Sequence, residues 1–179
     1  DYDKAINLDP NLATAYSNRG NSYRSLGENQ RAILDYDKAI NLDPNYANTY
    51  YNRGNIYASL GEHQRAIADY DKAINLDPNL ALAYYNRGTS YGSLGEYQRA
   101  IADYDKAISL DPNDATAYSK RGTSYGVLGE HQRAIADYDK AINLDPNYAK
   151  AYYNRGNSYW SLGKYQRAIA DYDKVINLD

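Results

Sequence analysis

Residues 47–80 read ANTYYNRGNIYASLGEHQRAIADYDKAINLDPNL, and close copies of this stretch follow one another along the 179-residue chain. Its Leu-Asp-Pro-Asn segment recurs every 34 residues, with the proline at Pro10, Pro44, Pro78, Pro112 and Pro146. A strict period of this length is typical of one supersecondary unit copied along a chain. Each such unit contacts mainly its neighbours, so the sequence predicts a stack of units without one central core.

Two amphipathic helices are predicted within each unit, because apolar and small residues recur there at three- and four-residue steps. We expect Asp43 to cap the first helix and Pro44 to be its first residue. Gly61 should end that helix in a left-handed conformation. The second helix should then run from about Glu62 to Leu76. The unit is therefore predicted to be an antiparallel pair of helices, each of roughly 14 to 16 residues and about 20 Å long.

A glycine stands in the middle of each predicted first helix, where it costs about 1 kcal/mol relative to alanine. Its recurrence indicates that the backbone of the second helix approaches closely. For Gly54 we expect the neighbours to be Ala66 and Tyr70. The five glycines are Gly20, Gly54, Gly88, Gly122 and Gly156.

An arginine precedes each of these glycines, and a partly buried arginine needs a partner of opposite charge. We predict an ion pair of the Arg53–Asp69 type within each unit. The alternative partner for Asp69 is Arg65, four residues earlier on the same helix.

The pattern Tyr-x-x-Arg-Gly-x-x-Tyr-x-x-Leu-Gly, followed by Ala-Ile-x-x-Tyr-x-x-Ala-Ile-x-Leu-Asp-Pro, resembles the tetratricopeptide repeat (TPR) over the whole chain. The resemblance implies an all-α fold, an α-α superhelix in which antiparallel helix pairs stack into a right-handed solenoid. It also implies that the first helices line a concave groove that holds an extended peptide or a partner helix. The predicted repeats cover residues 13–46, 47–80, 81–114, 115–148 and 149–179, after residues 1–12 as the second half of an earlier second helix.

Composition excludes several classes of function. A net charge of −3 and a pI near 5.4 argue against a large electrostatic footprint for nucleic acid or an anionic membrane. No apolar run reaches the roughly 18 residues that a membrane span needs. Cysteine is absent, which excludes disulfides, thiolate chemistry and cysteine-based zinc sites. The cellular compartment stays unassigned, with the cytoplasm weakly favoured.

No catalytic, metal-binding or cofactor-binding residues are predicted. In Asp35-Tyr36-Asp37 and its copies the two carboxylates lie two residues apart on a helix and point in different directions, so they cannot share a metal ion. We expect one aspartate to pair with arginine and the other to face solvent. His63 and His131 have no third metal ligand nearby, and a solvated surface position is favoured for both. The chain is thus predicted not to be an enzyme.

A candidate binding face lies on the first helices, opposite the stripe that packs against the second helices. Amide side chains there can donate to and accept from a peptide backbone, and tyrosines add contact area. The residue before each arginine is Asn18, Asn52, Asn86, Lys120 or Asn154. Beside these lie Ser17, Tyr51, Tyr85, Ser119 and Tyr153, and one turn further come Asn21, Asn55, Thr89, Thr123 and Asn157.

The favoured function is a non-catalytic protein–protein interaction scaffold that binds a peptide or helix in this groove. A chaperone-tail receptor is disfavoured, because only Lys120, Lys150 and Asn154 approach the basic cluster that such TPR domains use. Two alternatives stay open: a recruiting arm of a larger enzyme or sensor, and a designed or amplified array without a specific ligand. Trp160 is either an anchor for a ligand or the cover of an exposed helix end.

The ends of the chain suggest self-association. No polar capping helix follows residue 179, and repeat arrays generally need caps for solubility. We expect Tyr172, Val175 and Ile176 to leave part of an apolar face uncovered. The sequence therefore predicts end-to-end stacking on another molecule, or a protein that continues in both directions.

Overall fold

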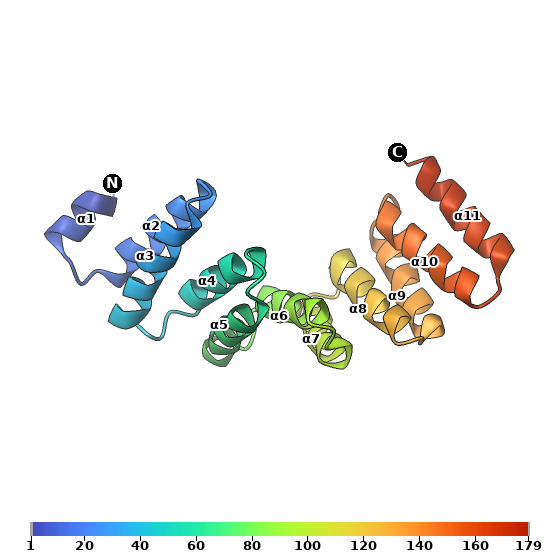
Figure 1. Ribbon diagram of the computed structural model, residues 1–179, viewed down its shortest axis with the longest axis horizontal. Helices are drawn as coiled ribbons and strands as arrows, with labels where there is room; N and C mark the ends of the chain where they lie inside the picture. Colours follow the sequence, from blue (N-terminus) through green and yellow to red (C-terminus); the bar gives the residue numbers. More distant parts are fainter. Residues whose placement is uncertain (1, 179) are drawn as a thin grey trace. The chain divides into compact units, whose positions relative to one another are not determined.

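The computed structural model describes residues 2–178, and all regular secondary structure in that range is α-helical (Figure 1). Asp1 and Asp179, at which the first and last predicted segments begin and end, lie outside the described residues. The chain forms two compact units, residues 1–90 and 91–179, which meet within the sixth helix. The helices are α1 (Tyr2–Leu8), α2 (Ala13–Ser25), α3 (Asn29–Leu42), α4 (Ala47–Ser59), α5 (His63–Leu76), α6 (Ala81–Ser93), α7 (Tyr97–Leu110), α8 (Ala115–Val127), α9 (His131–Leu144), α10 (Ala149–Ser161) and α11 (Tyr165–Ile176).

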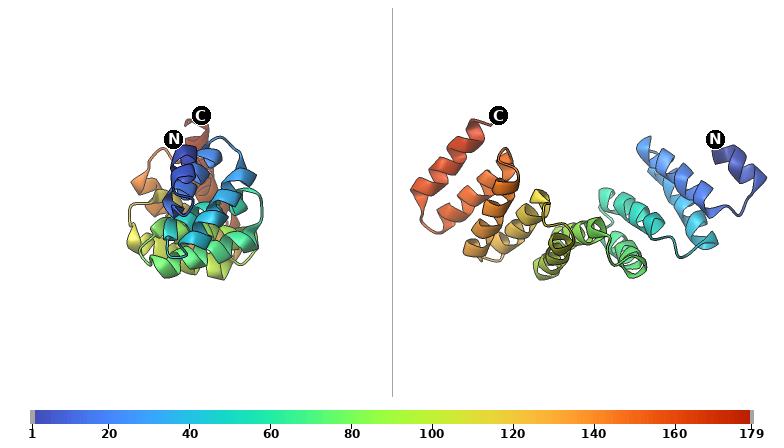
Figure 2. Two further views of the ribbon diagram at one scale, coloured as in Figure 1. Left: turned by 90° about the vertical axis from the view of Figure 1, so that its left-hand side faces the viewer. Right: turned by 180° about the vertical axis from the view of Figure 1, so that it is seen from behind.

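In the first unit, α2 packs against α3 and α4 packs against α5, and each pair lies side by side in the ribbon views (Figures 1 and 2). A link of three residues joins the helices of a pair. Its glycine, Gly27 or Gly61, has a φ of 76° or 77°, as expected of the left-handed residue that ends a helix. The pairs are joined to each other through contacts of α3 and α2 with α4.

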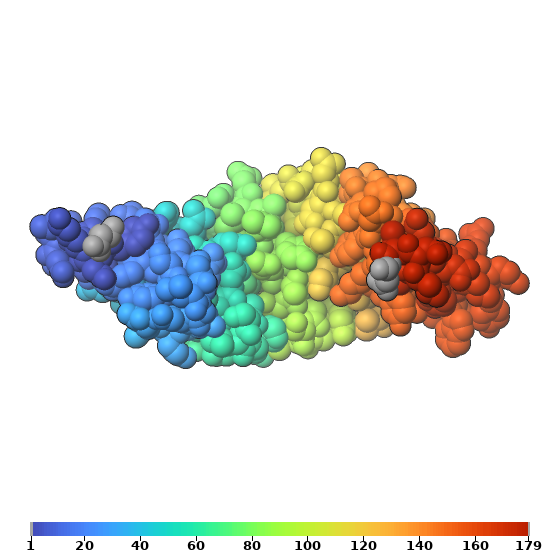
Figure 3. All heavy atoms as spheres, turned by 90° about the horizontal axis from the view of Figure 1, so that it is seen from above, coloured from blue at the N-terminus to red at the C-terminus, as the bar shows by residue number. Residues whose placement is uncertain are grey.

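The second unit repeats the arrangement. Helices α8 and α9 form one antiparallel pair and α10 and α11 the next, with α10 also packed against α9. These helices, coloured yellow to red, lie next to one another in Figure 1 and in the right-hand view of Figure 2. In the space-filling view the atoms of consecutive helices within each unit adjoin without a gap, for example the blue atoms of the first unit (Figure 3).

The predicted start of the first helices is wrong by three residues. Helix α4 begins at Ala47, after Tyr46, so Pro44 lies in a turn. Asp43 has an extended backbone at the end of α3, and its carboxylate accepts a hydrogen bond from the backbone N–H of Asn45 at 3.0 Å. The aspartate therefore stabilises the turn between repeats. Aspartate side chains are suited both to such turns and to helix capping. As a result the first helices are shorter than expected, with 13 residues.

The predicted close approach at the mid-helix glycine is confirmed. A Cβ atom built on Gly54 would lie 2.8 Å from Cε1 of Tyr70 and 3.3 Å from the carbonyl oxygen of Ala66. Gly20 has the same relation to Tyr36, and both tyrosines are buried. The core of these pairs thus includes a tyrosine ring packed on a glycine backbone, which explains why tyrosine rather than a smaller apolar residue recurs there.

The fold class predicted from the sequence is confirmed: the chain is all-α, and each unit is built of stacked antiparallel helix pairs of the α-α superhelix type. The extent of each repeat stays a prediction, although the first helices begin at the same interval of 34 residues. No helix in residues 2–178 combines the length and the apolar character needed to cross a membrane.

Candidate functional site

The predicted amide residues of the first unit are linked from one first helix to the next. The Nδ2 of Asn52 on α4 donates to Oδ1 of Asn21 on α2 at 3.0 Å. In the same way Nδ2 of Asn86 on α6 donates to Oδ1 of Asn55 on α4 at 2.9 Å. We call these four residues the amide ladder. The ladder forms because each first helix stacks on the next, which brings an asparagine from one position of a repeat next to an asparagine from another position of the neighbouring repeat.

Buried tyrosines of the second helices also donate hydrogen bonds to the amide ladder. The hydroxyl of Tyr36 donates to Oδ1 of Asn21 at 2.7 Å, and that of Tyr70 donates to Oδ1 of Asn55 at 2.8 Å. Burial raises the pKa of Tyr36 to about 12, so this hydroxyl keeps its proton. The oxygens of Asn21 and Asn55 therefore accept two hydrogen bonds each, whereas their Nδ2 groups have no acceptor among the described residues. The ladder presents donors that could take the carbonyl oxygens of a bound chain.

Tyr51 lies beside the ladder, and Tyr85 and Tyr153 occupy the equivalent position of other repeats. The ring of Tyr51 packs on that of Tyr70 with centroids 6.1 Å apart, and its hydroxyl accepts from Nδ2 of Asn86 at 3.2 Å. In the second unit Tyr153 packs on Tyr172 at 6.0 Å and is 52% exposed. Tyr85 on α6 is half-buried. Packing fixes the rings of Tyr51 and Tyr153 while part of each stays accessible, which suits a binding surface.

Two residues predicted for this face are not on it. Ser17 is only 2% exposed and its hydroxyl bonds with that of Thr49 on α4 at 3.0 Å. Ser119 is 3% exposed. A small side chain at this position lets the next helix pack over it, whereas tyrosine extends past that contact. Asn18, by contrast, is exposed, with no hydrogen bond of its side chain to the described residues.

In the second unit the same face is more polar and carries positive charge. Lys120 on α8 is half-buried, and burial together with the nearby charge of Lys150 lowers its pKa. Neither lysine forms an ion pair with the described residues. Asn154 makes a long contact, from its Nδ2 to the hydroxyl of Thr123 at 3.4 Å, and Asn157 accepts from Tyr172 at 2.9 Å.

A pocket of about 220 Å³ lies among these residues of the second unit. We call it the Gly126 pocket, since the missing side chain of Gly126 leaves it open on α8. Helices α8, α9 and α10 contribute its walls, which contain three residues of the predicted face, Thr123, Asn154 and Asn157. The lining consists of Thr123, Gly126, Val127, His131, Tyr138, Asn154, Asn157, Ser158 and Ser161.

The two histidines are only partly exposed, so the predicted solvated surface position holds only in part. His63 and His131 are half-buried, and the Nδ1 atom of each is buried without a hydrogen-bond partner among the described residues. No group of three or more His, Cys, Asp or Glu side chains in residues 2–178 is arranged to hold a metal ion.

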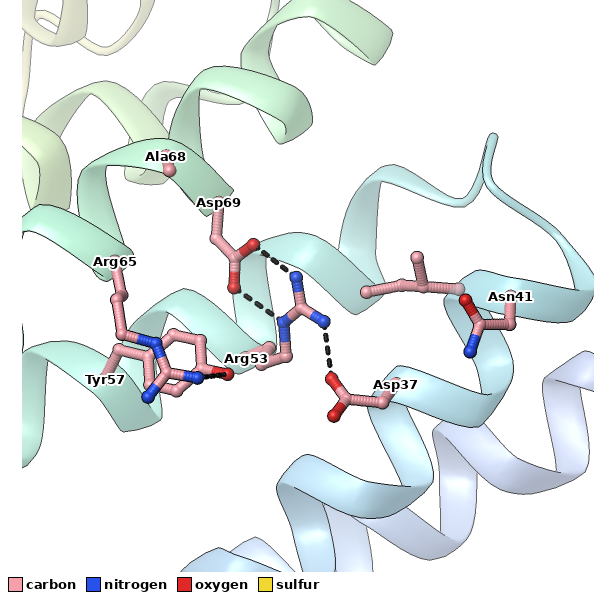
Figure 4. A pocket seen from close by; sticks show the side chains of 8 residues that line it. Asp37, Asn41, Arg53, Tyr57, Arg65, Ala68 and Asp69 are labelled. Carbon is pink, nitrogen blue, oxygen red and sulfur yellow. Dashed lines mark hydrogen bonds and ion pairs between the residues drawn. The ribbon is translucent and has the colours of Figure 1, made fainter.

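The ion pair predicted between the two helices of a repeat is confirmed at Arg19, Arg53, Arg121 and Arg155. Nε and Nη2 of Arg53 donate to the two oxygens of Asp69 at 2.8 and 2.6 Å (Figure 4). The alternative pairing is absent, because Arg65 bonds to Glu62 and to the hydroxyl of Tyr57 instead. The same bidentate pair is formed by Arg19 with Asp35, Arg121 with Asp137 and Arg155 with Asp171.

The second aspartate of an Asp-Tyr-Asp is exposed as predicted, with 43% of the Asp37 side chain accessible, but in most copies it also bonds to an arginine, which was not predicted. Nη1 of Arg53 donates to Asp37 of the preceding repeat at 2.5 Å (Figure 4). Burial alone would lower the pKa of Arg53, but its bonds to both carboxylates raise it. The same bond to the preceding repeat joins Arg19 to Asp3, Arg87 to Asp71, Arg121 to Asp105 and Arg155 to Asp139.

This network lines a second pocket, of about 510 Å³, shown in Figure 4. It includes Asp37, Arg53, Tyr57, Arg65 and Asp69. The guanidinium of Arg65 lies 3.9 Å from the centroid of the Tyr57 ring. The charged groups here are already paired with one another, and the Arg53–Asp37 bond among them joins consecutive repeats.

Comparison with known proteins identifies the family. The pattern described as "TPR repeat" matches residues 20–61, 54–95 and 127–163, and that described as "Tetratricopeptide repeat" matches 81–114 and 149–179, with a further pattern of that description at 1–33 and 103–136. The chain belongs to the tetratricopeptide repeat family, whose members are generally non-catalytic scaffolds for protein interactions. A search among curated proteins gave no match.

Solved structures agree with this assignment. A crystal structure of MamA is 33% identical, with a TM-score of 0.88 over 93% of this chain and 91% of that one. YrrB, described as "a TPR protein with an unusual peptide-binding site", is 29% identical, with a TM-score of 0.88 over 99% and 92%. MamA from Desulfovibrio magneticus RS-1 is 26% identical, with a TM-score of 0.88 over 93% and 94%.

Proposed function

We propose that this chain is a non-catalytic scaffold that binds an extended peptide, or a partner helix, along the face of its first helices. In the first unit the binding residues are those of the amide ladder with Tyr51 and Tyr85. In the second unit they are Lys120, Asn154, Asn157 and Tyr153. Asn18 extends the face at the N-terminal side.

One observation carries this proposal: the ladder leaves unpaired amide N–H groups in a row. Asn21 and Asn55 occupy the same position in consecutive repeats, and each has a saturated oxygen and a free Nδ2. An extended chain offers carbonyl oxygens at regular intervals, so it can accept from both amides without regard to its side chains. Membership of the TPR family and the peptide-binding site of YrrB support the same function.

Selection from a displayed library of random peptides tests the proposal. Peptides that bind the full chain are measured by fluorescence anisotropy against the Tyr51→Ala variant. The matched control is Tyr46→Ala, which removes a tyrosine of the turn before α4 that is 36% exposed. We expect Tyr51→Ala to weaken binding by more than about tenfold, as loss of a central aromatic contact does. Equal affinities of the two variants, or no enriched peptide, would contradict the proposal.

We further propose that α11 associates with a second copy of the chain. Ile169 and Ile176 are 57% and 72% exposed on this helix, and Val175 is half-buried. Covering these side chains would remove apolar area from water. Light scattering over a range of concentrations should show association that Ile169→Glu and Ile176→Glu abolish, and a monomer at all concentrations would rule it out.

A further inference from the structure

At one position of the first helices the residue type varies more between repeats than at the neighbouring positions. This position lies beside the candidate binding face. The residue is Arg24 in α2 but Gly126 in α8, three repeats further along. In the first unit this arginine reaches the neighbouring helix, where its Nη1 donates to Oδ1 of Asn52 at 3.0 Å. Burial raises the pKa of Tyr36, and the positive charge of Arg24 opposes part of that rise.

The corresponding place in the second unit is open. Asn154 and Tyr138 occupy the positions of Asn52 and Tyr36, three repeats along, and both line the Gly126 pocket. The pocket therefore occupies the space that the side chain of Arg24 fills in the first unit.

An acceptor is also left without its donor. Asn154 keeps the orientation of Asn52, since its Nδ2 points to Thr123 at 3.4 Å as that of Asn52 points to Asn21 at 3.0 Å. Its Oδ1 has no hydrogen-bond donor among the described residues, whereas Oδ1 of Asn52 has Arg24. Ser158, where the first unit has the buried Ile56, adds a hydroxyl to the wall.

We propose that the Gly126 pocket binds the guanidinium of an arginine side chain of the peptide ligand, in the manner in which Arg24 binds Asn52 within the chain. The Oδ1 of Asn154 accepts from the guanidinium. The planar head lies over the space that Gly126 leaves on α8. Because the pocket lies on the face proposed above to bind peptides, this assignment rests on that function and adds a side-chain preference to it.

The charges near the pocket oppose a cation, so the proposed preference for arginine depends on the hydrogen bond to Asn154 and on the shape of the pocket. No Asp, Glu, Lys or Arg side chain lines the pocket. Lys120 and Lys150 lie on the same face, where they repel a cation. Their effect is screened by salt, with a Debye length of about 8 Å at physiological ionic strength. Affinity for an isolated arginine should consequently rise with salt, whereas binding driven by a carboxylate partner would fall.

The test uses N-acetyl-arginine N-methylamide as the probe, titrated into the full chain and followed by the side-chain amide signals of Asn154 and Asn157 in NMR spectra. The equivalent derivatives of lysine, glutamine and glutamate are titrated in parallel. We expect the arginine derivative to bind best and to shift both signals. No shift, or tighter binding of the glutamine or glutamate derivative, would overturn the assignment.

Reciprocal variants sharpen the test. The arginine side chain of the Gly126→Arg variant should fill the pocket. It should lower the affinity for the probe by more than about tenfold, the equivalent of 1.4 kcal/mol. Arg24→Ala should open a second site and bring the signal of Asn52 into the titration. Gly126→Ala is the control for α8, since its Cβ would approach no atom closer than 3.9 Å and leaves most of the pocket open. Thermal unfolding shows that each variant is folded.

Outcomes for the pocket and for the scaffold function can be told apart. If selected peptides bind in a Tyr51-dependent manner but lack arginine and tolerate Gly126→Arg, the pocket assignment fails and the scaffold function stands. If the probe binds and Gly126→Arg abolishes it while peptide selection yields nothing, the pocket is a guanidinium site, but the scaffold function and the assignment of that guanidinium to a peptide ligand both fail.

Discussion

Arg53 and Asp69 form a bidentate ion pair that joins the two helices of a repeat, with distances of 2.8 and 2.6 Å. The Asp69 side chain is 7% exposed and that of Arg53 is 18% exposed. The remaining nitrogen of Arg53 reaches Asp37 of the preceding repeat, whose side chain is 43% exposed. One guanidinium thus holds a repeat together and fastens it to its neighbour.

The two carboxylates on Arg53 should contribute unequally to stability. Asp69→Ala leaves a largely buried guanidinium short of its main partner, and we expect a loss of about 3 kcal/mol. Asp37→Ala breaks a more exposed pair and should cost at most about 1 kcal/mol. Urea unfolding followed by circular dichroism measures both, and equal losses would contradict the difference in burial.

Alanine should have opposite effects at two glycines of the first helices. At Gly54 the new Cβ would lie 2.8 Å from the buried Tyr70 ring, and overpacking of this kind costs about 1–3 kcal/mol. At Gly126 its nearest neighbours would lie 3.9 Å away, so the helix should gain up to about 1 kcal/mol. Thermal unfolding of the two variants provides the comparison, and changes of the same sign would show that packing does not decide the effect.

The amide ladder should contribute to stability as well as to binding. Asn52→Ala removes the donor to Asn21 and the acceptor of Arg24, and we expect a loss of about 1–2 kcal/mol. Asn18→Ala is the matched control, because Asn18 holds the same position in the preceding repeat but is exposed. It should change stability by less than about 0.5 kcal/mol. Equal stability of the Asn52→Ala and Asn18→Ala variants would mean that the ladder does not stabilise the fold.

Stability should fall in strong alkali because of the buried tyrosines. Burial raises the pKa of Tyr36 and of Tyr138 to about 12 in the folded chain, against about 10 in the unfolded chain. Between these values the unfolded chain binds fewer protons, so stability decreases as pH rises, by up to about 1.4 kcal/mol per pH unit for each tyrosine. The contribution is complete below pH 10 and lost as pH passes 12.

The variant Tyr138→Phe isolates this effect. It retains the ring on Gly122 but cannot ionise. Urea unfolding at a series of alkaline pH values should show a shallower decrease than in the unaltered chain. An unchanged slope would mean that Tyr138 ionises as easily in the folded chain as in the unfolded one.

The sequence predicted contacts within a repeat better than contacts between repeats. The Arg53–Asp69 and Gly54–Tyr70 contacts follow from helix period and repeat length, since both pairs are separated by 16 residues across one short link. The Arg53–Asp37 bond depends on how one pair of helices lies on the next, which periodicity does not specify. The same holds for the bonds from Asn52 to Asn21 and Arg24.

Two other differences between the predicted and the observed structure, the start of α4 and the burial of Ser17, have local causes. Asp-Pro favours both the start of a helix and a turn, and in this chain the aspartate side chain stabilises the turn, which delays the start of α4 to Ala47. Ser17 and Tyr51 share a position on the candidate face, but only the larger side chain extends beyond the neighbouring helix. A signal for the Gly126 pocket was present in the sequence, as the change from arginine to glycine at one position of the repeat.

The central claim, that the amide face of the first helices is where a ligand binds, is tested most directly by NMR titration of the full chain with a selected peptide. The side-chain amides of Asn21, Asn52, Asn55 and Asn86 report on the ladder, and those of Asn45 and Asn79 in the turns between repeats serve as internal controls. We expect the ladder signals to shift and the turn signals to stay unchanged. Shifts confined to the turns, or to the residues around Arg53 and Arg65, would contradict the central claim.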